Sequence, residues 1–415
     1  MKKQKILVLL TESFPFDRKE NFLESEINFI NGFDQVLIFS CSVVDVNYQR
    51  ELDDPKIKIF PFLFLQSERN IHKFFRYLNS LFQIPFWQEL RHMQKLNRLN
   101  LNIFKTSLDF VSFSEQRVKK ISKIIKNNVP PNSEIVFYSY WLYYHAYIGT
   151  RLKQKFVKSK AISRAHRFDV HEEHRPDSYL PMRSYIFENL DAVYSISDYT
   201  KHYLERNYFT GKDNFKVSKL GTIDYGICTV NINRKPLKLV SCSSLIPLKR
   251  VHKIIEALKI IQDIEIEWTH FGDGILLEKL CELSKDVSAN IKINLKGNVS
   301  NPELMSAYMK EDFHLFINVS SIEGVPVSIM EAISFGIPVV ATDVGGVSEV
   351  VFDGDNGLLL DENFNTEELV AKIKYFAYLE NERYKEFREK AREIWLEKYN
   401  AETNYRKFYS DLTRI

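Results

Sequence analysis

Residues 313–346 of this 415-residue chain read FHLFINVSSIEGVPVSIMEAISFGIPVVATDVGG. Residues 313–320 are mostly apolar and predict a buried strand. A loop with Glu323 and Gly324 follows, and Pro326 suits the first turn of a helix, because its missing N–H would have no partner there. The free N–H groups at such a helix end can bind an anion. This helix and the next predicted strand, Pro338–Ala341, indicate a parallel α/β domain.

Two glutamates flank this helix end. Glu323 lies just outside the predicted helix, and Glu331 lies roughly 8 Å further along its axis than Pro326. One ligand could meet a carboxylate, an anion site and a second carboxylate in that order, which matches the sugar, diphosphate and ribose of a nucleotide sugar. Alternatively, Glu323 only complements the helix dipole and Glu331 is solvated. The residues alone leave both interpretations open, although the apolar neighbours of Glu331 indicate a buried carboxylate that needs a partner.

The length of the chain predicts two or three domains. In the second half, strands are predicted at Leu237–Ser241, Ile266–Phe271, Ile291–Leu295, Phe313–Val319 and Pro338–Ala341, with helical patterns between them. In the first half, strands are predicted at 4–10, Gln35–Phe39, Ile57–Phe62, Ile135–Ser139, Ala161–Arg164 and Ala192–Ile196, with a helix beginning near Glu20. This alternation predicts an α/β chain of two Rossmann-like, doubly wound domains. A polar linker is expected at Val230–Pro236, and three helices are expected over 365–413.

Composition and charge argue against a membrane-spanning protein and indicate the kind of partner that the chain faces. No run is long and apolar enough to predict a membrane span, and the four cysteines form no close pairs, which is typical of a reducing cytoplasm. The net charge of +3 is unevenly shared: residues 1–235 carry 36 Lys and Arg against 25 Asp and Glu, and residues 236–415 carry 21 against 29. The first half is therefore expected to face an anionic partner.

Residues 66–130 concentrate this basic charge, with 12 Lys and Arg against 4 Asp and Glu, interleaved with aromatic residues. Such a segment suits contact with an anionic membrane surface. A solvated helix whose aromatic side chains pack into the domain core is an equal alternative. No nucleic-acid-binding motif is recognisable, so nucleic acid is not an expected partner.

The pair Glu323 and Glu331 with the Gly-Val-Pro insert, the run Gly336–Thr342 and the pair Gly345-Gly346 resemble the retaining nucleotide-sugar glycosyltransferases of family four. The resemblance implies the GT-B architecture, in which two Rossmann-like domains face a cleft. Residues 1–230 would form the acceptor domain, residues 237–395 the donor domain, and residues 396–415 a helix returning to the N-terminal domain. It further implies transfer of a hexose-type sugar, from a UDP-sugar rather than a GDP-sugar, to a glycan or lipid-linked glycan.

The resemblance also assigns the donor site. Its catalytic residues would be Glu323 at the sugar, Lys249 at the diphosphate and His166 at the sugar C6 region, with Glu331 on the ribose. In the loop that holds Lys249, Ser244 stands where the family has arginine and Arg250 where it has glycine, so Arg250 is the expected substitute cation. The other predicted donor contacts are Gly272 beside the diphosphate, Asn298 and Val299 at the base, and Gly324, Val325, Pro326 and Val327 at the helix end.

The acceptor side is predicted from the first half. The segment Ser163–Asp169 ends a strand and resembles the histidine loop of the family, although a lone histidine is more often structural. The acceptor-side candidates are Phe16, Tyr140, Arg164 and Asp169, with Arg183 and Ser197 expected where the cleft closes. Tyr138–His145 could stack on an acceptor sugar or belong to the core.

Dehydrogenase chemistry and metal binding are not predicted from the sequence. The loop Thr11–Phe16 lacks the glycine fingerprint of a nicotinamide dehydrogenase. Asp353 and Asp355 are expected to form a surface turn, and neither a metal nor a cofactor is predicted. A non-catalytic sugar-nucleotide-binding partner subunit and a hydrolysing sugar-nucleotide epimerase remain alternatives. The expected location is the cytoplasm, with contact to the inner face of the membrane through residues 66–130.

Overall fold

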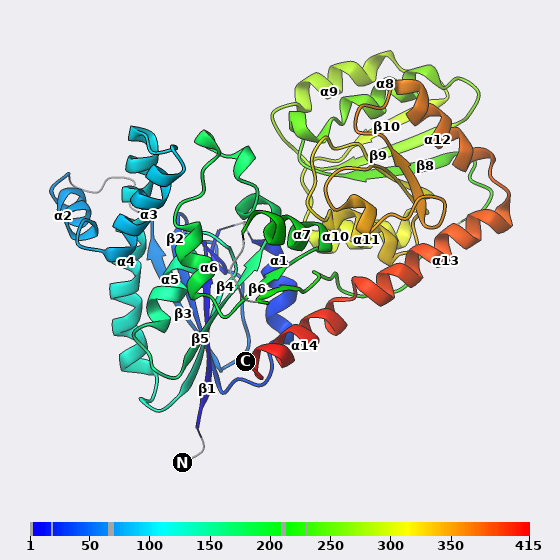
Figure 1. Ribbon diagram of the computed structural model, residues 1–415. Helices are drawn as coiled ribbons and strands as arrows, with labels where there is room; N and C mark the ends of the chain where they lie inside the picture. Colours follow the sequence, from blue (N-terminus) through cyan, green and yellow to red (C-terminus); the bar gives the residue numbers. More distant parts are fainter. Residues whose placement is uncertain (1–2, 18–19, 65–69, 209–212, 230) are drawn as a thin grey trace. The chain divides into compact units, whose positions relative to one another are not determined.

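The computed structural model describes residues 3–17, 20–64, 70–208, 213–229 and 231–415 (Figure 1). The chain divides into two compact units. The N-terminal unit comprises Met1–Ser218 and Tyr405–Ile415, and the C-terminal unit comprises Lys219–Asn404. No described helix combines the length and the apolar composition that crossing a bilayer requires.

The N-terminal unit is built on a parallel sheet whose seven described strands lie in the order β3-β2-β1-β4-β5-β6-β7. These strands are β1 (Lys5–Thr11), β2 (Gln35–Val43), β3 (Ile57–Leu63), β4 (Glu134–Ser139), β5 (Ser159–Ala165), β6 (Ala192–Ser195) and β7 (Phe215–Val217). The strand order changes direction between β1 and β4. The carboxyl ends of these two strands therefore form the switch point at which doubly wound sheets bind ligands.

Both faces of this sheet are covered, which explains the continuous apolar run of β1. Ile6 and Val8 pack with residues of α4 and α5, whereas Leu7 and Leu9 belong to a separate cluster with residues of α1 and α14. This alternation follows from the two-residue period of a strand. The helices of the unit are α1 (Asn21–Glu26), α2 (Asn70–Ser80), α3 (Ile84–Lys95), α4 (Leu101–Asn128), α5 (Tyr144–Lys153), α6 (Arg183–Asn189), α7 (Asp198–Asn207) and the part of α14 (Ala401–Leu412) that begins at Tyr405.

The C-terminal unit has a second parallel sheet, with six described strands in the order β10-β9-β8-β11-β12-β13. They are β8 (Leu237–Cys242), β9 (Ile266–Phe271), β10 (Ile291–Leu295), β11 (Leu315–Asn318), β12 (Val339–Thr342) and β13 (Gly357–Leu360). The helices are α8 (His252–Ile260), α9 (Leu277–Leu283), α10 (Asn301–Lys310), α11 (Val327–Ser334), α12 (Thr366–Tyr378) and α13 (Asn381–Lys398). The predicted class, two Rossmann-like doubly wound domains, is confirmed.

The last helix, α14, supplies part of the N-terminal core, as the sequence predicted. Phe408, Tyr409 and Leu412 are buried in the cluster that also holds Leu7 and Leu9. The ring centroid of Phe408 lies 5.2 Å from that of Tyr138 and 5.1 Å from that of Tyr194. The end of the chain is therefore required to complete the N-terminal unit.

Arg164 lies in this core and not at an acceptor surface, so its predicted role is wrong. Its side chain is fully buried, with the guanidinium 3.6 Å from Glu26 Oε2 and 4.4 Å from the ring centroid of Phe408. Arg164 Nε also donates to the hydroxyl of Tyr138. Glu26 Oε1 accepts from the hydroxyls of Tyr138 and Tyr409 at 2.8 and 3.1 Å. The pair thus links α1, β5 and α14.

Replacing Glu26 with alanine is expected to lower the free energy of unfolding of the N-terminal unit by about 3–5 kcal/mol, because it leaves the buried Arg164 guanidinium without its counter-charge. Urea unfolding followed by fluorescence measures this loss. Glu24→Ala is the control, since Glu24 is an exposed carboxylate paired with Arg50, and such pairs contribute at most about 1 kcal/mol. Equal unfolding midpoints for the two variants would contradict the assigned role of the Glu26–Arg164 pair.

Candidate functional site

The loop between β11 and α11 presents Glu323 together with Lys249, although the two residues are far apart in the sequence. Glu323 Oε1 lies 2.6 Å from Lys249 Nζ and 3.3 Å from Asn318 Nδ2. Lys249 ends a short helix, η5 (Pro247–Lys249), in the loop that follows β8. The carboxyl ends of neighbouring strands β8 and β11 therefore bring the two predicted catalytic groups of this unit together.

The pair Gly345-Gly346 packs against the backbone of the loop that carries Glu323. Gly346 N donates to Gly324 O at 2.8 Å. Gly345 has a φ of +60°, and a Cβ on it would lie 2.0 Å from the carbonyl oxygen of Glu323. A side chain at Gly345 would therefore displace the Glu323 backbone, which gives a physical reason for glycine at this point of the motif.

The helix end beside Glu323 is open. α11 begins at Val327, and Pro326 is its N-cap residue, in an extended conformation, rather than a residue of its first turn. Ile329 N and Met330 N bond to the carbonyl of Pro326, and no side chain of the described part of the chain caps the helix. The helix dipole adds positive character here, so this end is suited to an anion.

Glu331, in α11, is a half-buried carboxylate with one amide partner. Its Oε1 accepts from Asn301 Nδ2 of α10 at 2.7 Å. Burial raises the pKa of Glu331 to about 7, although the bond from Asn301 opposes that rise. A carboxylate so poorly solvated gains from further hydrogen-bond donors, such as the hydroxyls of a ribose.

A pocket of about 760 Å³ in the C-terminal unit collects other predicted donor contacts. It is lined by Cys242, Ser243, Ser244, Phe271, Gly272, Asp273, Gly274, Ile275, Asn298, Val299 and Leu304. Its volume falls in the range of small-molecule sites. Gly272 is required by the close approach of two loops, because its φ is +138° and a Cβ on it would lie 1.9 Å from Ser243 O.

Arg250 does not serve as the substitute phosphate cation, and this prediction is wrong. Its guanidinium donates to the carbonyls of Val319 at 2.7 Å, Ser320 at 3.0 Å and Glu362 at 2.8 Å. The guanidinium of Arg250 therefore faces the loop after β11, and its hydrogen bonds hold that loop in place. Ser244 is exposed at the pocket. Lys249 and the α11 N-terminus remain the candidate positive groups for a diphosphate.

In the N-terminal unit, His166 is a buried residue that directly follows β5. It is 6% exposed, and its ring centroid lies 4.7 Å from those of Tyr140 and Trp141. Its Nδ1 lies 3.8 Å from Asp169 Oδ2, and its Nε2 has no hydrogen-bond partner among the described residues. Buried polar groups are nearly always bonded, so the His166 ring is a candidate for contact with a ligand.

Three further acceptor-side predictions are corrected by burial. Asp169 is fully buried, and its carboxylate accepts from the backbone N–H of His166 and of Leu142 at 2.7 Å each. The Tyr140 side chain is also fully buried, and Phe16 is 5% exposed. Asp169 and Tyr140 pack around His166, and no acceptor contact is assigned to any of these three residues. Arg183 and Ser197 are structural as well: Arg183 Nη1 donates to Leu142 O, and Ser197 caps α7.

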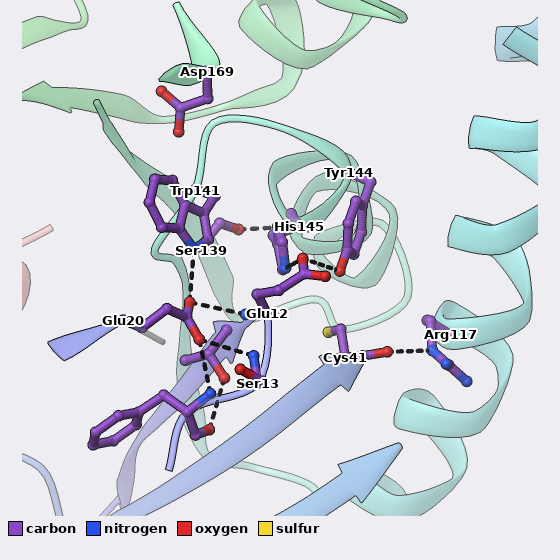
Figure 2. Close-up of polar contacts among 12 residues, drawn as sticks. Glu12, Ser13, Glu20, Cys41, Arg117, Ser139, Trp141, Tyr144, His145 and Asp169 are labelled. Atoms are coloured by element: carbon purple, nitrogen blue, oxygen red, sulfur yellow. Dashed lines mark hydrogen bonds and ion pairs between the residues drawn. The ribbon is translucent and has the colours of Figure 1, made fainter. Parts of the chain in front are cut away.

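The residue that the sequence analysis missed is Glu12, which directly follows β1 at the switch point of the sheet (Figure 2). Its Oε2 accepts from the Tyr144 hydroxyl at 2.5 Å and lies 3.4 Å from His145 Nε2. The Glu12 side chain is 36% exposed, whereas that of His145 is 2% exposed. The position after the first strand at a reversal of strand order is the signal that could have identified it.

Glu20 fixes the loop that carries Glu12. Its carboxylate accepts from the backbone N–H groups of Glu12, Ser13 and Phe14 at 2.7–3.0 Å, and from Trp141 Nε1 at 2.6 Å (Figure 2). A charged acceptor with four donors makes a rigid turn. The backbone of Glu12 and the Trp141 indole are therefore both held by Glu20 Oε1.

The turn at Asp353 is structural, as predicted from its composition. Asp353 Oδ1 accepts from Leu359 N at 2.7 Å, and Gly354 has a φ of +82°. These contacts close the reversal that leads into β13.

Comparison with known protein families gives a match for most of the C-terminal unit. Residues 229–394 match the family described as glycosyl transferases group 1. The match lies within the C-terminal unit and does not extend to the rest of the chain. It holds Glu323, Glu331 and Lys249, so the prediction of a glycosyltransferase is confirmed at the level of the domain that carries the candidate donor site.

Named relatives agree with this family. A poly(ribitol-phosphate) alpha-N-acetylglucosaminyltransferase of Staphylococcus aureus (strain COL) is 32% identical over 165 residues, which are 39% of this chain and 32% of the relative. An N-acetyl-alpha-D-glucosaminyl L-malate synthase of Bacillus anthracis is 26% identical over 231 residues, which are 55% of each chain. The chain thus spans about a third and about half of the lengths of these two curated relatives.

Solved structures share the fold over the whole chain. A structure of the lipopolysaccharide outer core galactosyltransferase WaaB in its apo form superposes with a TM-score of 0.68, at 15% identity, covering 99% of both chains. A structure of Anabaena Alr3699/HepE with UDP and glucose superposes with a TM-score of 0.65, at 16% identity, covering 100% of both chains. At such identities the likeness shows the fold alone.

Proposed function

We propose that the protein is a retaining glycosyltransferase that moves a hexose-type sugar from a UDP-sugar to a glycan or lipid-linked glycan, without a metal. The observation that carries this proposal is the arrangement of Glu323, the open α11 N-terminus and Glu331, with Lys249 at 2.6 Å from Glu323, inside a group 1 glycosyl transferase domain. The names of the relatives support hexose transfer, and the HepE structure with UDP and glucose supports a uridine nucleotide as the donor.

The chemistry follows from the charges at this site. The bond from the sugar C1 to the diphosphate oxygen breaks, and negative charge builds on the departing diphosphate. Lys249 and the N–H groups of α11 stabilise that charge electrostatically. Glu323 accepts hydrogen bonds from sugar hydroxyls, and Glu331 accepts them from the ribose.

The acceptor hydroxyl forms the new bond on the face that the diphosphate leaves, and its proton passes to the diphosphate oxygen. No protein nucleophile is required in this scheme. The proposed role of His166 is contact with the transferred sugar, supported by its buried Nε2, which has no hydrogen-bond partner among the described residues.

The acceptor is proposed to bind at the carboxyl end of β1. Glu12 places a partly exposed carboxylate at this strand end, and the Trp141 and Phe168 rings, 6.4 Å apart, offer apolar faces for a sugar ring. Phe168 is 67% exposed, which suits such a contact.

Glu12→Gln is expected to raise the KM for the acceptor about tenfold, because a hydrogen bond to a charged group contributes about 1.5–3 kcal/mol. The KM for the donor should stay unchanged. Initial-rate kinetics with each substrate varied in turn measure both constants. Glu24→Gln is the matched control on the same unit, and an unchanged acceptor KM in Glu12→Gln would exclude Glu12 from the acceptor site.

The proposed reaction is tested by incubating the protein with UDP-glucose, UDP-galactose or UDP-N-acetylglucosamine and a panel of glycan and lipid-linked acceptors. Proton NMR of the glycosylated product should show an α-anomer, the configuration of these donors. A β-linked product would contradict retention. Consumption of the donor with release of a different free sugar, without any acceptor, would identify an epimerase instead.

A further inference from the structure

Helices α2 and α3 (Figure 1) and the turn between them carry large apolar side chains that are exposed. These residues are Phe74, Phe75, Leu78, Phe82, Ile84 and Trp87, and their exposed fractions run from 41% to 77%. We call them, with the cations described next, the α2–α3 surface. So large a group of exposed aromatic residues indicates an interaction site.

The opposite sides of the two helices pack against α4 and the rest of the N-terminal unit. Pro85, Phe86, Leu90 and Met93 of α3 are buried, and the Phe86 ring centroid lies 5.7 Å from that of Phe104 in α4. On α2, the Tyr77 hydroxyl bonds to Asp109 of α4. Burial in the core, the alternative for these aromatic residues, therefore holds for Phe86 but not for Phe74, Phe75, Phe82 or Trp87.

The charges on the α2–α3 surface are of one sign. Lys73, Arg76, Arg91 and Lys95 lie on these two helices. Glu89 is the one acidic residue in the sequence between positions 70 and 108, and it is buried, where its Oε1 accepts from the Tyr179 hydroxyl at 2.7 Å. Arg91 and Lys95 follow Ile84 and Trp87 at helical spacing, so cations and apolar side chains share one side of α3.

We propose that the α2–α3 surface binds the surface of an anionic lipid bilayer. Aromatic and aliphatic side chains enter the boundary between headgroups and acyl chains, and Lys and Arg contact lipid phosphates. A protein partner would need acidic groups around an apolar groove, whereas the aromatic side chains here are exposed together with Lys73, Arg91 and Lys95. The observed chemistry therefore favours a lipid surface.

The same helices connect to the loop that follows His166. Arg98, just after α3, lies 3.5 Å from Glu172 and donates to the carbonyls of Asp177 and Ser178. The Tyr179 hydroxyl bonds to both Glu89 of α3 and Ser107 of α4. A bilayer on the α2–α3 surface would thus lie beside the proposed acceptor domain loop. Given the proposed function, we infer that the acceptor is carried on a lipid.

Flotation of the full chain with lipid vesicles tests the binding. The protein is mixed at low salt with phosphatidylcholine vesicles, or with vesicles of equal parts phosphatidylcholine and phosphatidylglycerol. We expect at least tenfold more protein on the anionic vesicles, with the difference falling as salt rises. Wild-type protein that stays unbound to anionic vesicles at low salt would overturn the proposal.

Matched variants locate the contact. Phe74→Ser with Phe82→Ser and Trp87→Ser, and separately Arg91→Glu with Lys95→Glu, should each lower anionic vesicle binding at least tenfold. Val157→Ser with Tyr375→Ser and Leu396→Ser removes exposed apolar groups elsewhere, and Lys123→Glu with Lys126→Glu makes the same charge change on α4. These controls should bind like the wild type, and equal binding by all variants would overturn the assignment.

Two further readouts separate the alternatives. Thermal unfolding with and without UDP reports folding and donor binding, which do not depend on lipid, so loss of vesicle binding is distinguishable from failure of the proposed function. Light scattering after gel filtration reports self-association. A concentration-dependent dimer that the Phe74, Phe82 and Trp87 changes dissolve, with no vesicle binding, would assign this surface to a second copy of the chain and overturn the lipid proposal.

Discussion

Replacing Glu323 with glutamine is expected to lower the kcat of sugar transfer about 10²- to 10³-fold, the size of effect seen when one preorganised polar group is removed from a transition-state site. Glu323 is held by Lys249 and Asn318, so its carboxylate has one fixed position for the sugar hydroxyls. Glutamine keeps the shape but loses the charge that orders Lys249. The rate of UDP release with saturating donor and acceptor measures the loss.

The donor domain supplies a control for this change. Glu362→Gln neutralises an exposed glutamate whose backbone carbonyl, and not its side chain, bonds to Arg250. Its kcat should equal that of the wild type. Both variants should retain stabilisation by UDP, because Glu331 and the pocket remain intact. Wild-type turnover in Glu323→Gln would remove Glu323 from the catalytic site.

The affinity for UDP-glucose is expected to rise up to about tenfold between pH 6 and pH 8, because Glu331 has a pKa of about 7. Ribose hydroxyls donate to the ionised carboxylate, so bound nucleotide lowers this pKa. Below the free pKa, binding must release a proton and is weaker. A nucleotide sugar is the suitable probe, since its diphosphate has no terminal phosphate group that titrates in this range.

Glu331→Gln should remove this pH dependence and weaken binding at pH 8 by about 1.5–3 kcal/mol, the contribution of hydrogen bonds to a charged group. Calorimetric titrations at several pH values measure both effects. The pH dependence of folding without ligand runs in the opposite direction to that of ligand binding. The folded state binds the proton of Glu331 more tightly than the unfolded state does. The contribution of Glu331 to the free energy of unfolding therefore falls as pH rises from about 4.5 to about 7. A pH profile identical in wild type and Glu331→Gln would contradict ribose binding by Glu331.

Much of the fold could be predicted because buried parallel strands are continuous apolar runs. The predicted strands Ile266–Phe271 and Ile291–Leu295 coincide with β9 and β10, and the three helices expected at the end of the chain are α12, α13 and α14. The short strands β7 and β13 were missed. β13 has four residues and directly follows Asp353-Gly-Asp-Asn356, whose composition is typical of a turn, so its place depends on pairing with β12.

The site was less predictable where the direction of a side chain decides its role. Glu323, Glu331 and Lys249 were identified through their motifs. Arg250 was misassigned because its φ of +48° and the carbonyls that it binds are tertiary features. Arg164 was misassigned because its counter-charge, Glu26, is distant in the sequence. Glu12 was missed because only the strand order, in which β1 lies beside β4, places it at the switch point.

The most direct test of the central claim, a nucleotide-sugar donor site built by Glu331 and the α11 N-terminus, is thermal unfolding with UDP, GDP, ADP or CDP in the presence of EDTA. A ligand at 100 times its Kd stabilises the folded state by about 2.7 kcal/mol. The account predicts that UDP raises the Tm of the wild-type protein but not that of Glu331→Ala. No shift with any nucleotide, or an equal shift in the variant, would contradict it.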